Sequence, residues 1–265
     1  MHIIHTESSL MRATYIRRSA VAATAVSLAL LVTACGGEKG KTGGADKPTG
    51  GASAPAAAEP AAKVLTAAEL ESAVIAQGDV KGYKVEKPGA DDITKEVSTD
   101  KAECKPLADV VSAVALGTPA ATVQRKVVQE PSKDIKSPAD AFNVSAIMDS
   151  LAAYEGKGAE EVVASLRAAG TACAGGFTVT ADGEKTKVLK VTEQKVTGGQ
   201  EAVGFTLLSD MEGTPMPVKI AVVRQGGTLA SFSVFNLGVA TTGAKDFPLP
   251  ADLIAAQVAK VAKLG

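Results

Sequence analysis

The apolar positions of this sequence form two zones, separated by a stretch with no apolar residue larger than alanine. The first zone is a run of about 15 residues ending at Val32, too short to span a membrane, which takes roughly 20. The second zone starts at Leu65 and extends to the end, with apolar positions at helical and strand spacings. We therefore predict three segments: residues 1–34, residues 35–63 and a single folded domain over 64–265.

The clearest helix signal lies at the start of the folded domain, where Thr66 and Glu69 fit a capping box. Leu70 and Val74 form the inward stripe of this helix, and Gly78 is expected to end it. Similar start and stop signals predict three more helices: from Pro106 to a stop at Gly117 and Pro119, from Gly158 to a stop at Gly170, and from Pro250 towards the C-terminus.

Short apolar runs bounded by glycine, proline or aspartate predict the strands. Residues 142–154 fit either a helix or a strand, and we assign a strand, partly on the resemblance described below. Turns are expected at 182–183, 210–217 and 225–227, the last two within an antiparallel meander. The expected strands are 82–86, 122–129, 142–154, 177–179, 188–196, 202–209, 218–224 and 228–237. Helices packed with an antiparallel sheet, without regular alternation, indicate an α+β fold.

The N-terminal zone has the layout of an export signal. Arg12, Arg17 and Arg18 precede the apolar run, and small residues follow it. The sequence Val32-Thr33-Ala34-Cys35 resembles the lipobox of bacterial lipoproteins, which implies that Cys35 receives diacylglycerol and becomes the mature N-terminus. Two acyl chains anchor a protein stably. An ordinary secretory signal with an incidental cysteine is the alternative.

Two details of this signal stay open. Met11 is a plausible true start, because residues 11–35 already form a complete signal. Arg17 and Arg18 fit a twin-arginine export signal, but the bulky apolar residue that usually follows is absent, so general secretion is equally compatible. Residues 36–62 are almost wholly small and polar and cannot offset their ordering entropy, so we expect a disordered tether.

Composition excludes several classes of function. Both histidines, His2 and His5, precede Cys35, which removes His-dependent nucleophilic catalysis and His-ligated zinc from the mature chain. Removing Arg12, Arg17 and Arg18 from the 28 basic residues, and Glu7 from the 29 acidic ones, leaves 25 against 28, a net charge of −3. Neither this charge nor the 3% of aromatic residues predicts a nucleic-acid partner.

Two cysteines, Cys104 and Cys173, remain once Cys35 is acylated. In an oxidising exterior an even pair predicts a disulfide. The alternatives are two free thiols or, less favoured, a metal site without histidine. A bond between them would join the start of the second predicted helix to the end of the third.

Three local patterns mimic known sites without their context. Gly156-Lys157-Gly158 lacks the third glycine of a dinucleotide loop and precedes two glutamates that would repel a pyrophosphate. The Ser-x-x-Lys match at 98–101 follows a Lys-Thr-Gly match at 41–43, the wrong order for a penicillin-interacting enzyme. Asp210 and Glu212 lack calcium-loop spacing. We therefore predict no catalytic residue, no cofactor and no metal.

Short motifs along the domain carry a further resemblance. They are 65–70 (Leu-Thr-Ala-Ala-Glu-Leu), Glu103-Cys104, 150–154 (Ser-Leu-Ala-Ala-Tyr), 173–177 (Cys-Ala-Gly-Gly-Phe), 222–227 (Val-Val-Arg-Gln-Gly-Gly) and 256–260 (Ala-Gln-Val-Ala-Lys). With them the chain resembles secreted lipoproteins of high-GC Gram-positive bacteria (actinobacteria) and, more distantly, the extracellular sensor domain of mycobacterial serine/threonine kinases. That resemblance implies an α+β fold with a ligand-sized cleft. Those domains usually contain more than one disulfide, and this chain can form one.

Together these observations predict a lipoprotein anchored through Cys35 to the outer face of the cytoplasmic membrane. Its leading function is a non-catalytic binding or sensor module for a small or apolar ligand, a lipid or an envelope component. The first alternative is a scaffold that docks an envelope protein without a ligand pocket. A hydrolase that uses only carboxylates is less favoured, since it needs two acids about 5–10 Å apart in a cleft.

Overall fold

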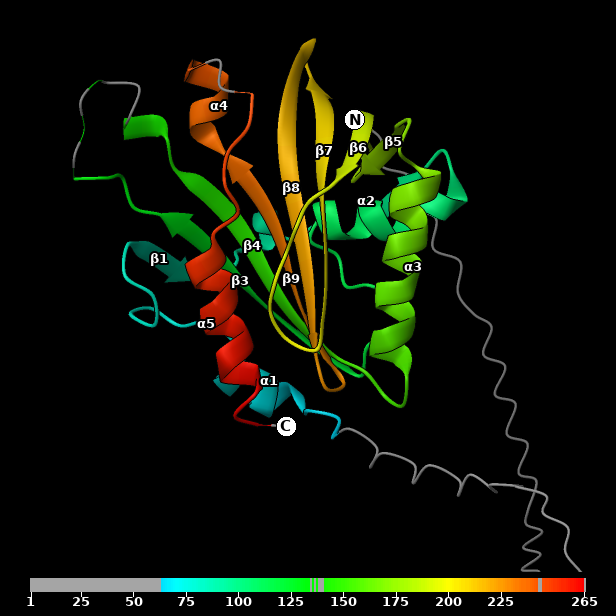
Figure 1. The fold of residues 1–265 in the computed structure, drawn as a ribbon, viewed down its shortest axis with the longest axis vertical. Coiled ribbons are helices and arrows are strands. Elements are labelled where there is room, and N and C mark those ends of the chain that lie inside the picture. Colours follow the sequence, from blue (N-terminus) through cyan, green and yellow to red (C-terminus); the bar gives the residue numbers. More distant parts are fainter. Residues whose placement is uncertain (1–62, 134, 136, 138–140, 243–244, 265) are drawn as a thin grey trace, which may run out of the picture. The chain divides into compact units, whose positions relative to one another are not determined.

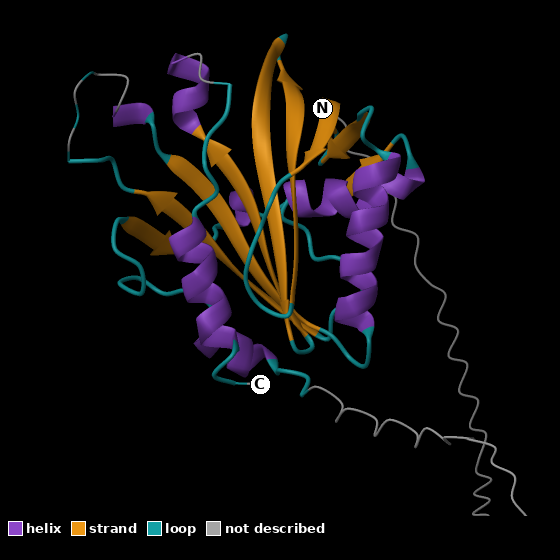
Figure 2. Ribbon diagram, viewed as in Figure 1, coloured by secondary structure: helices purple, strands orange, loops and turns teal. Residues whose placement is uncertain are grey.

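One antiparallel sheet of nine strands organises the part of the chain that the structure describes (Figure 1). The computed structural model describes residues 63–133, 135, 137, 141–242 and 245–264. The strand order is β1-β3-β4-β9-β8-β7-β6-β5-β2, and helices accompany the sheet (Figure 2). The predicted α+β class is therefore confirmed. The expected signal at 1–34 and the tether up to residue 62 lie outside the described residues.

The elements follow the predicted order along the chain. Helices are α1 (Ala67–Ala73), α2 (Lys105–Val111), α3 (Gly158–Ala172), α4 (Leu237–Thr242) and α5 (Ala251–Val261), with short 3-10 turns at Ala90–Asp92 and Ala102–Cys104. Strands are β1 (Tyr83–Glu86), β2 (Val97–Thr99), β3 (Ala121–Gln129), β4 (Ser145–Ala153), β5 (Phe177–Ala181), β6 (Glu184–Glu193), β7 (Glu201–Met211), β8 (Thr214–Gln225) and β9 (Thr228–Asn236). None of these helices has the length and apolar character needed to cross a membrane.

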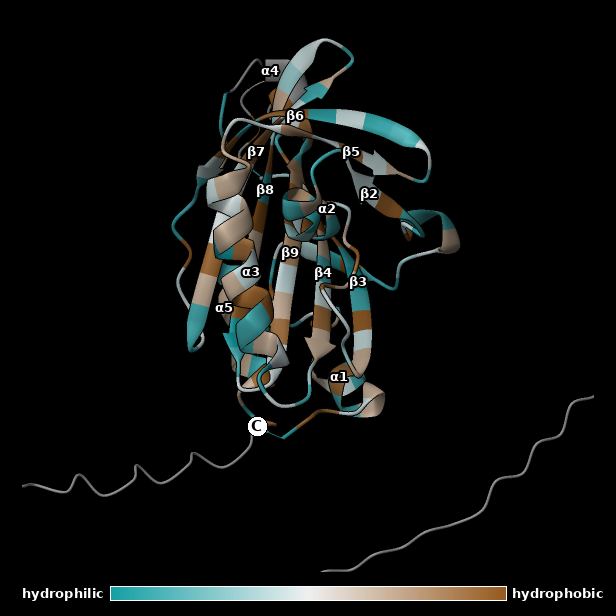
Figure 3. Cartoon of the chain, turned by 90° about the vertical axis from the view of Figure 1, so that its right-hand side faces the viewer, coloured by the Kyte–Doolittle hydropathy of each residue, from teal (hydrophilic) through white to brown (hydrophobic). Residues whose placement is uncertain are grey.

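Helices on both faces of the sheet create two separate hydrophobic cores. The first core packs α2 and α3 against one face, and the second packs α1 and α5 against the other. Successive residues of β8 alternate between them: Ile220 and Val222 enter the first core, while Ala221 and Val223 enter the second. A strand that is covered on both faces is buried at every position, and β8 is buried without interruption from Pro217 to Val223. Figure 3 shows α2 in front of the sheet, beside β9.

Helix α1 begins as predicted but ends earlier. Thr66 Oγ1 accepts the Glu69 N–H, and the Glu69 carboxylate accepts the Thr66 N–H, which completes the capping box. The helix stops at Ala73 rather than Gly78, because Gln257 of α5 takes over its end. The buried Gln257 amide accepts the Ile75 N–H at 2.8 Å and donates to the Ala73 carbonyl at 2.9 Å. Partners from a distant helix thus replace the expected glycine stop.

The predicted stop of α3 at Gly170 is also wrong, since the helix continues through it to Ala172. A Cβ at position 170 would lie 2.2 Å from Cε1 of the Phe205 ring on β7. Gly170 therefore provides the space in which α3 packs closely on the sheet. It is a packing position, and it does not terminate the helix.

We expect Gly170→Ala to lower the free energy of unfolding by about 1–3 kcal/mol, because the added methyl group collides with the Phe205 ring. The overlap should outweigh the ~1 kcal/mol that alanine gains over glycine inside a helix. Urea unfolding of the purified protein measures the change. Gly175→Ala is the matched control, since a Cβ there meets nothing within 4 Å. Equal stability of the two variants would contradict the packing role.

The hairpin between β7 and β8 is much tighter than the predicted turn over 210–217. Its turn is Glu212-Gly213, both with positive φ (53° and 85°), as a two-residue type I′ turn requires. Pro215 and Pro217 consequently lie inside β8, opposite β7 residues. They are tolerated because β8 pairs with β9 only from Lys219 onward, so within the described residues no strand pairs with that side of this end of β8.

Other departures from the prediction are local. Helix α2 ends at Val111, because the chain turns into the left-handed region at Ala113 (φ 55°) before it reaches Gly117. Strand β2 and helix α4 were not predicted. The ambiguous stretch 142–154 contains β4, so the assignment as a strand is confirmed.

Candidate functional site

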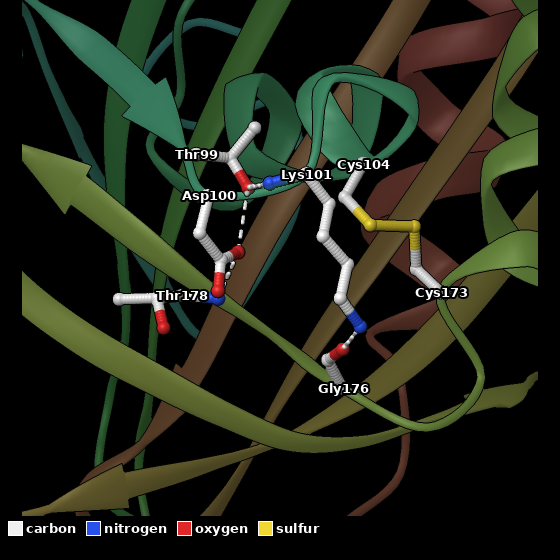
Figure 4. The surroundings of a disulfide bond; sticks show 7 residues. All are labelled: Thr99, Asp100, Lys101, Cys104, Cys173, Gly176 and Thr178. Atoms are coloured by element: carbon white, nitrogen blue, oxygen red, sulfur yellow. Dashed lines mark hydrogen bonds between the residues drawn. A yellow bond between two sulfur atoms is a disulfide. The ribbon is translucent and has the colours of Figure 1, made fainter.

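A disulfide between Cys104 and Cys173 ties α2 to α3 (Figure 4). Cys104 is the N-cap residue of α2 and Cys173 the C-cap residue of α3. The sulfur atoms are 1.94 Å apart, the Cα atoms are 5.8 Å apart, and both side chains are fully buried. The bond therefore fixes the start of one helix against the end of the other, within the first core.

The segment beside the disulfide is held by polar contacts of its own. Lys101 Nζ donates to the Gly176 carbonyl at 2.7 Å, and the Asp100 carboxylate accepts the Thr178 N–H at 2.8 Å (Figure 4). Ser98 lies in edge strand β2, paired with Thr180 of β5. The Ser-x-x-Lys match thus begins in a strand and ends in the loop that follows it. Its lysine binds the chain beside the disulfide.

A large cavity lies between α2, α3 and residues 116–120. Its volume is about 930 Å³, near the upper end of the range for small-molecule sites, roughly 300–1,000 Å³. Leu116, Tyr154 and Val162 are buried and contribute an apolar floor. The hydroxyl of Tyr154, the residue that follows β4, donates to the Leu116 carbonyl at 2.7 Å and so ties the end of this strand to the loop. Burial raises the pKa of Tyr154, so the phenol stays neutral.

An ion pair forms the α2 side of this cavity. Lys105 and Asp109, one turn apart on α2, bind each other directly. Asp109 is only 6% exposed, and burial raises the pKa of its carboxyl, while the Lys105 hydrogen bond acts in the opposite direction. The ion pair therefore gives the α2 wall of the cavity a polar group that can contact a ligand, and it adds no net charge.

The α3 side of the cavity carries Glu155, Lys157 and Glu161. Within the described residues these three side chains have no ion-pair partner, which leaves one ammonium and two carboxylates available to a ligand. Gly156 (φ 55°) makes the turn into α3, and Lys157 occupies the N-cap position. The Gly156-Lys157-Gly158 pattern thus forms part of a cavity wall in which two glutamates would repel a phosphate.

A smaller, more apolar groove lies at the other end of α2. It has a volume of about 360 Å³ and is lined by Val111, Met148, Phe235 and Leu237, with the ion pair of Lys126 and Asp92 at its rim. Leu237 is 49% exposed, and Ile93, next to Asp92, is 43% exposed. This groove was not predicted, because its walls come from α2, β4, β9 and α4.

The other sequence-based expectations have plain outcomes. Cys35 lies outside the described residues, so its lipidation stays a prediction. No group of three or more metal-ligating side chains occurs within residues 63–264 as far as they are described. Asp210 is the next-to-last residue of β7, and its carboxylate accepts the Gly213 N–H at 2.8 Å, a contact that stabilises the turn at Glu212.

Comparison with known proteins adds a distant structural similarity. No protein-family model matches the sequence, and no curated protein matches it. The extracellular domain of PknH from Mycobacterium tuberculosis is similar at 13% identity with a TM-score of 0.46, covering 77% of this chain and 99% of that domain. The Rv0999 ortholog from Mycobacterium smegmatis is similar at 14% identity with a TM-score of 0.32, covering 77% of this chain and 98% of that one. The distant similarity expected from the short motifs is therefore present.

Proposed function

We propose that this protein is a non-catalytic extracytoplasmic binding module, held by a lipid on Cys35 at the outer face of the cytoplasmic membrane. It binds a small amphipathic ligand in the cavity between α2 and α3. The observation that carries the proposal is the cavity itself, which combines an apolar floor with charged side chains that are free to bind.

The proposed location rests on the sequence and on the disulfide. The arginine-flanked apolar run and the sequence Val32-Thr33-Ala34-Cys35 are typical of a lipoprotein signal. A buried structural disulfide such as Cys104–Cys173 is typical of proteins outside the cytoplasm.

The charges of the cavity define the class of ligand. Lys105 and Asp109 neutralise each other, so Glu155, Lys157 and Glu161 leave a net charge of about −1 for a ligand to meet. An apolar body would cover Leu116 and Val162, and a cationic or zwitterionic group would face the two glutamates. We therefore expect an amine-bearing amphiphile in preference to a phosphate or a carboxylic acid.

Native mass spectrometry of the processed, exported protein tests the proposal. Wild-type protein should retain a small molecule, and Thr118→Trp should lose it because the indole fills the cavity from an exposed loop position. Thr192→Trp, exposed on β6, is the control and should bind as the wild type does. Equal retention by all three proteins would contradict binding in this cavity.

The scaffold is the second candidate function, and it is favoured by the groove that Leu237 lines and by the exposed Ile93, next to the lining residue Asp92. Two large apolar side chains that are almost half exposed beside an apolar groove form a surface suited to a protein partner. An apo mass for the exported protein, with cross-linking to an envelope protein that Leu237→Lys abolishes, would support the scaffold. Turnover of a glycoside that Asp109→Asn abolishes would instead support the hydrolase.

A further inference from the structure

A row of polar side chains crosses four neighbouring strands at one end of the sheet. Tyr83 of β1 pairs with Gln129 of β3, and Ser145 of β4 pairs with Asn236 of β9. The Gln129 amide oxygen accepts the Ser145 N–H at 3.2 Å, which connects the two pairs. Tyr83 also packs in the second core, but Gln129, Ser145 and Asn236 are polar positions beside rows of the sheet that enter this core, and they call for an explanation.

This row borders a cavity of about 350 Å³. The segment Pro248–Asp252, which leads into α5, forms the opposite wall. A second hollow of about 570 Å³ shares Tyr83, Gln129 and Asp252 with it, so the two adjoin and form a groove along the edge of the domain. This groove is separate from the α2–α3 cavity, with which it shares no lining residue.

Hydrogen bonds among the lining side chains hold the groove in shape. Ser145 and Asn236 are each 5% exposed. The Asn236 amide donates to the Asn143 side-chain oxygen at 3.1 Å and accepts the Gly238 N–H at 2.9 Å. The Tyr83 hydroxyl donates to the Asp252 carboxylate at 3.0 Å. The side chains are therefore positioned before any ligand arrives, which reduces the entropy cost of binding.

Several hydrogen-bonding groups of the groove stay uncommitted. In the described part of the chain, neither the Gln129 amide nitrogen nor the Asn143 amide nitrogen has a partner, and both side chains are at least partly exposed. The Asp252 carboxylate has accepting capacity left beyond its bond to Tyr83. The groove thus offers amide donors on one wall and a carboxylate acceptor on the other.

We propose that this groove binds a neutral saccharide, as a second site beyond the α2–α3 cavity. A sugar hydroxyl both donates and accepts, so one ring can satisfy the amide donors and the Asp252 acceptor together. Among the described residues, Asp252 is the only acidic or basic one that lines the 350 Å³ cavity, an arrangement that disfavours a phosphate in that cavity. Lys81, Glu130 and Lys133 line the adjoining hollow. The Tyr83 ring is buried, so recognition depends on hydrogen bonds and not on stacking. The adjoining hollow provides room for further sugar units.

Two substitutions test the site without disturbing its internal contacts. Gln129→Glu keeps the oxygen that accepts the Ser145 N–H and removes the free amide donors. Asn143→Asp likewise keeps the oxygen that binds Asn236. Gln200→Glu is the matched control, because the Gln200 side-chain oxygen also accepts, from Arg224 and Gly226, outside the groove.

The measurement is an NMR titration of the protein with cellobiose and with N,N′-diacetylchitobiose, followed by an array of neutral glycans. A sugar that binds should shift the backbone amide signals of Gln129, Asn143 and Ser145. Gln129→Glu and Asn143→Asp should each weaken binding about tenfold, and Gln200→Glu should leave it unchanged. Absence of binding across the disaccharides and the array would overturn the proposal. So would shifts confined to other residues, or equal affinity in all variants.

Discussion

Asp149→Asn is expected to abolish a pH dependence that makes the wild-type protein less stable as the pH rises from about 4 to about 8. The free energy of unfolding should fall by roughly 1 kcal/mol per pH unit over this range through Asp149 alone. At pH 7 the variant should therefore exceed the wild type by about 4 kcal/mol, and near pH 4 the two should be similar.

The cause is a carboxyl group buried without a partner. Asp149 of β4 lies on the face of α1 and α5 and is fully buried, and neither of its oxygens has a hydrogen-bond partner among the residues that the structure describes. Arg125 lies opposite it on β3, but its guanidinium binds Glu71 of α1 at 2.9 Å. Burial raises the Asp149 pKa from 3.8 to about 8, against the weaker opposing effects of Arg125 and Lys260.

The sign follows from proton binding. Above pH 4 the unfolded chain has released the Asp149 proton, whereas the folded chain keeps it until about pH 8. The folded state then binds more protons, so its stability decreases as the pH rises and levels off above the folded pKa. An asparagine amide has no such proton to retain.

Urea unfolding of wild type and Asp149→Asn at intervals from pH 4 to 9 measures this difference. Asp91→Asn, on the exposed turn before β2, is the control and should follow the wild-type curve. Glu71→Gln provides a second test, because it frees Arg125 to approach Asp149 and should move the transition to lower pH. Parallel curves for wild type and Asp149→Asn would refute the prediction.

Removal of the disulfide is the other change with a large expected effect. The double substitution Cys104→Ala, Cys173→Ala should lower the free energy of unfolding by about 4 kcal/mol, because the bond closes a loop with a sequence separation of 69 residues. The same change should weaken ligand binding in the α2–α3 cavity, since the cavity walls lose the bond between the two helices. Urea unfolding and native mass spectrometry measure the two effects.

Reduction of the wild-type protein provides the control for side-chain packing. Both sulfur atoms are buried, so dithiothreitol should act only once urea has begun to unfold the chain. Reduced wild type and the double variant, which has no disulfide to reduce, should then unfold at similar urea concentrations. A double variant as stable as oxidised wild type would show that the link contributes nothing to the free energy of unfolding.

Local signals in the sequence were sufficient for the class of fold and for the start of most elements. The capping box at Thr66 and Glu69 acts through a neighbour three residues away, and the Asp182-Gly183 turn adopts the positive φ angles that its residues favour. Such signals act between residues that are close in the sequence. They can therefore be recognised without knowing which distant segments pack against them. The two cysteines indicated that α2 and α3 lie side by side, but they did not predict the cavity between these helices.

Contacts between distant residues determined the rest. Gln257 binds the end of α1 although the residue it binds, Ile75, lies 182 positions away in the sequence. Gly170 lies inside α3 because the Phe205 ring leaves no room for a larger side chain there. The register of β3, β4 and β9 places Asp149 opposite an arginine that binds elsewhere, and it brings Gln129, Ser145 and Asn236 into one polar row. The sequence by itself was sufficient to predict an α+β domain whose two cysteines pair. Only the tertiary structure decided where its cavities and its buried carboxyl group lie, because sheet register and helix packing set those positions together.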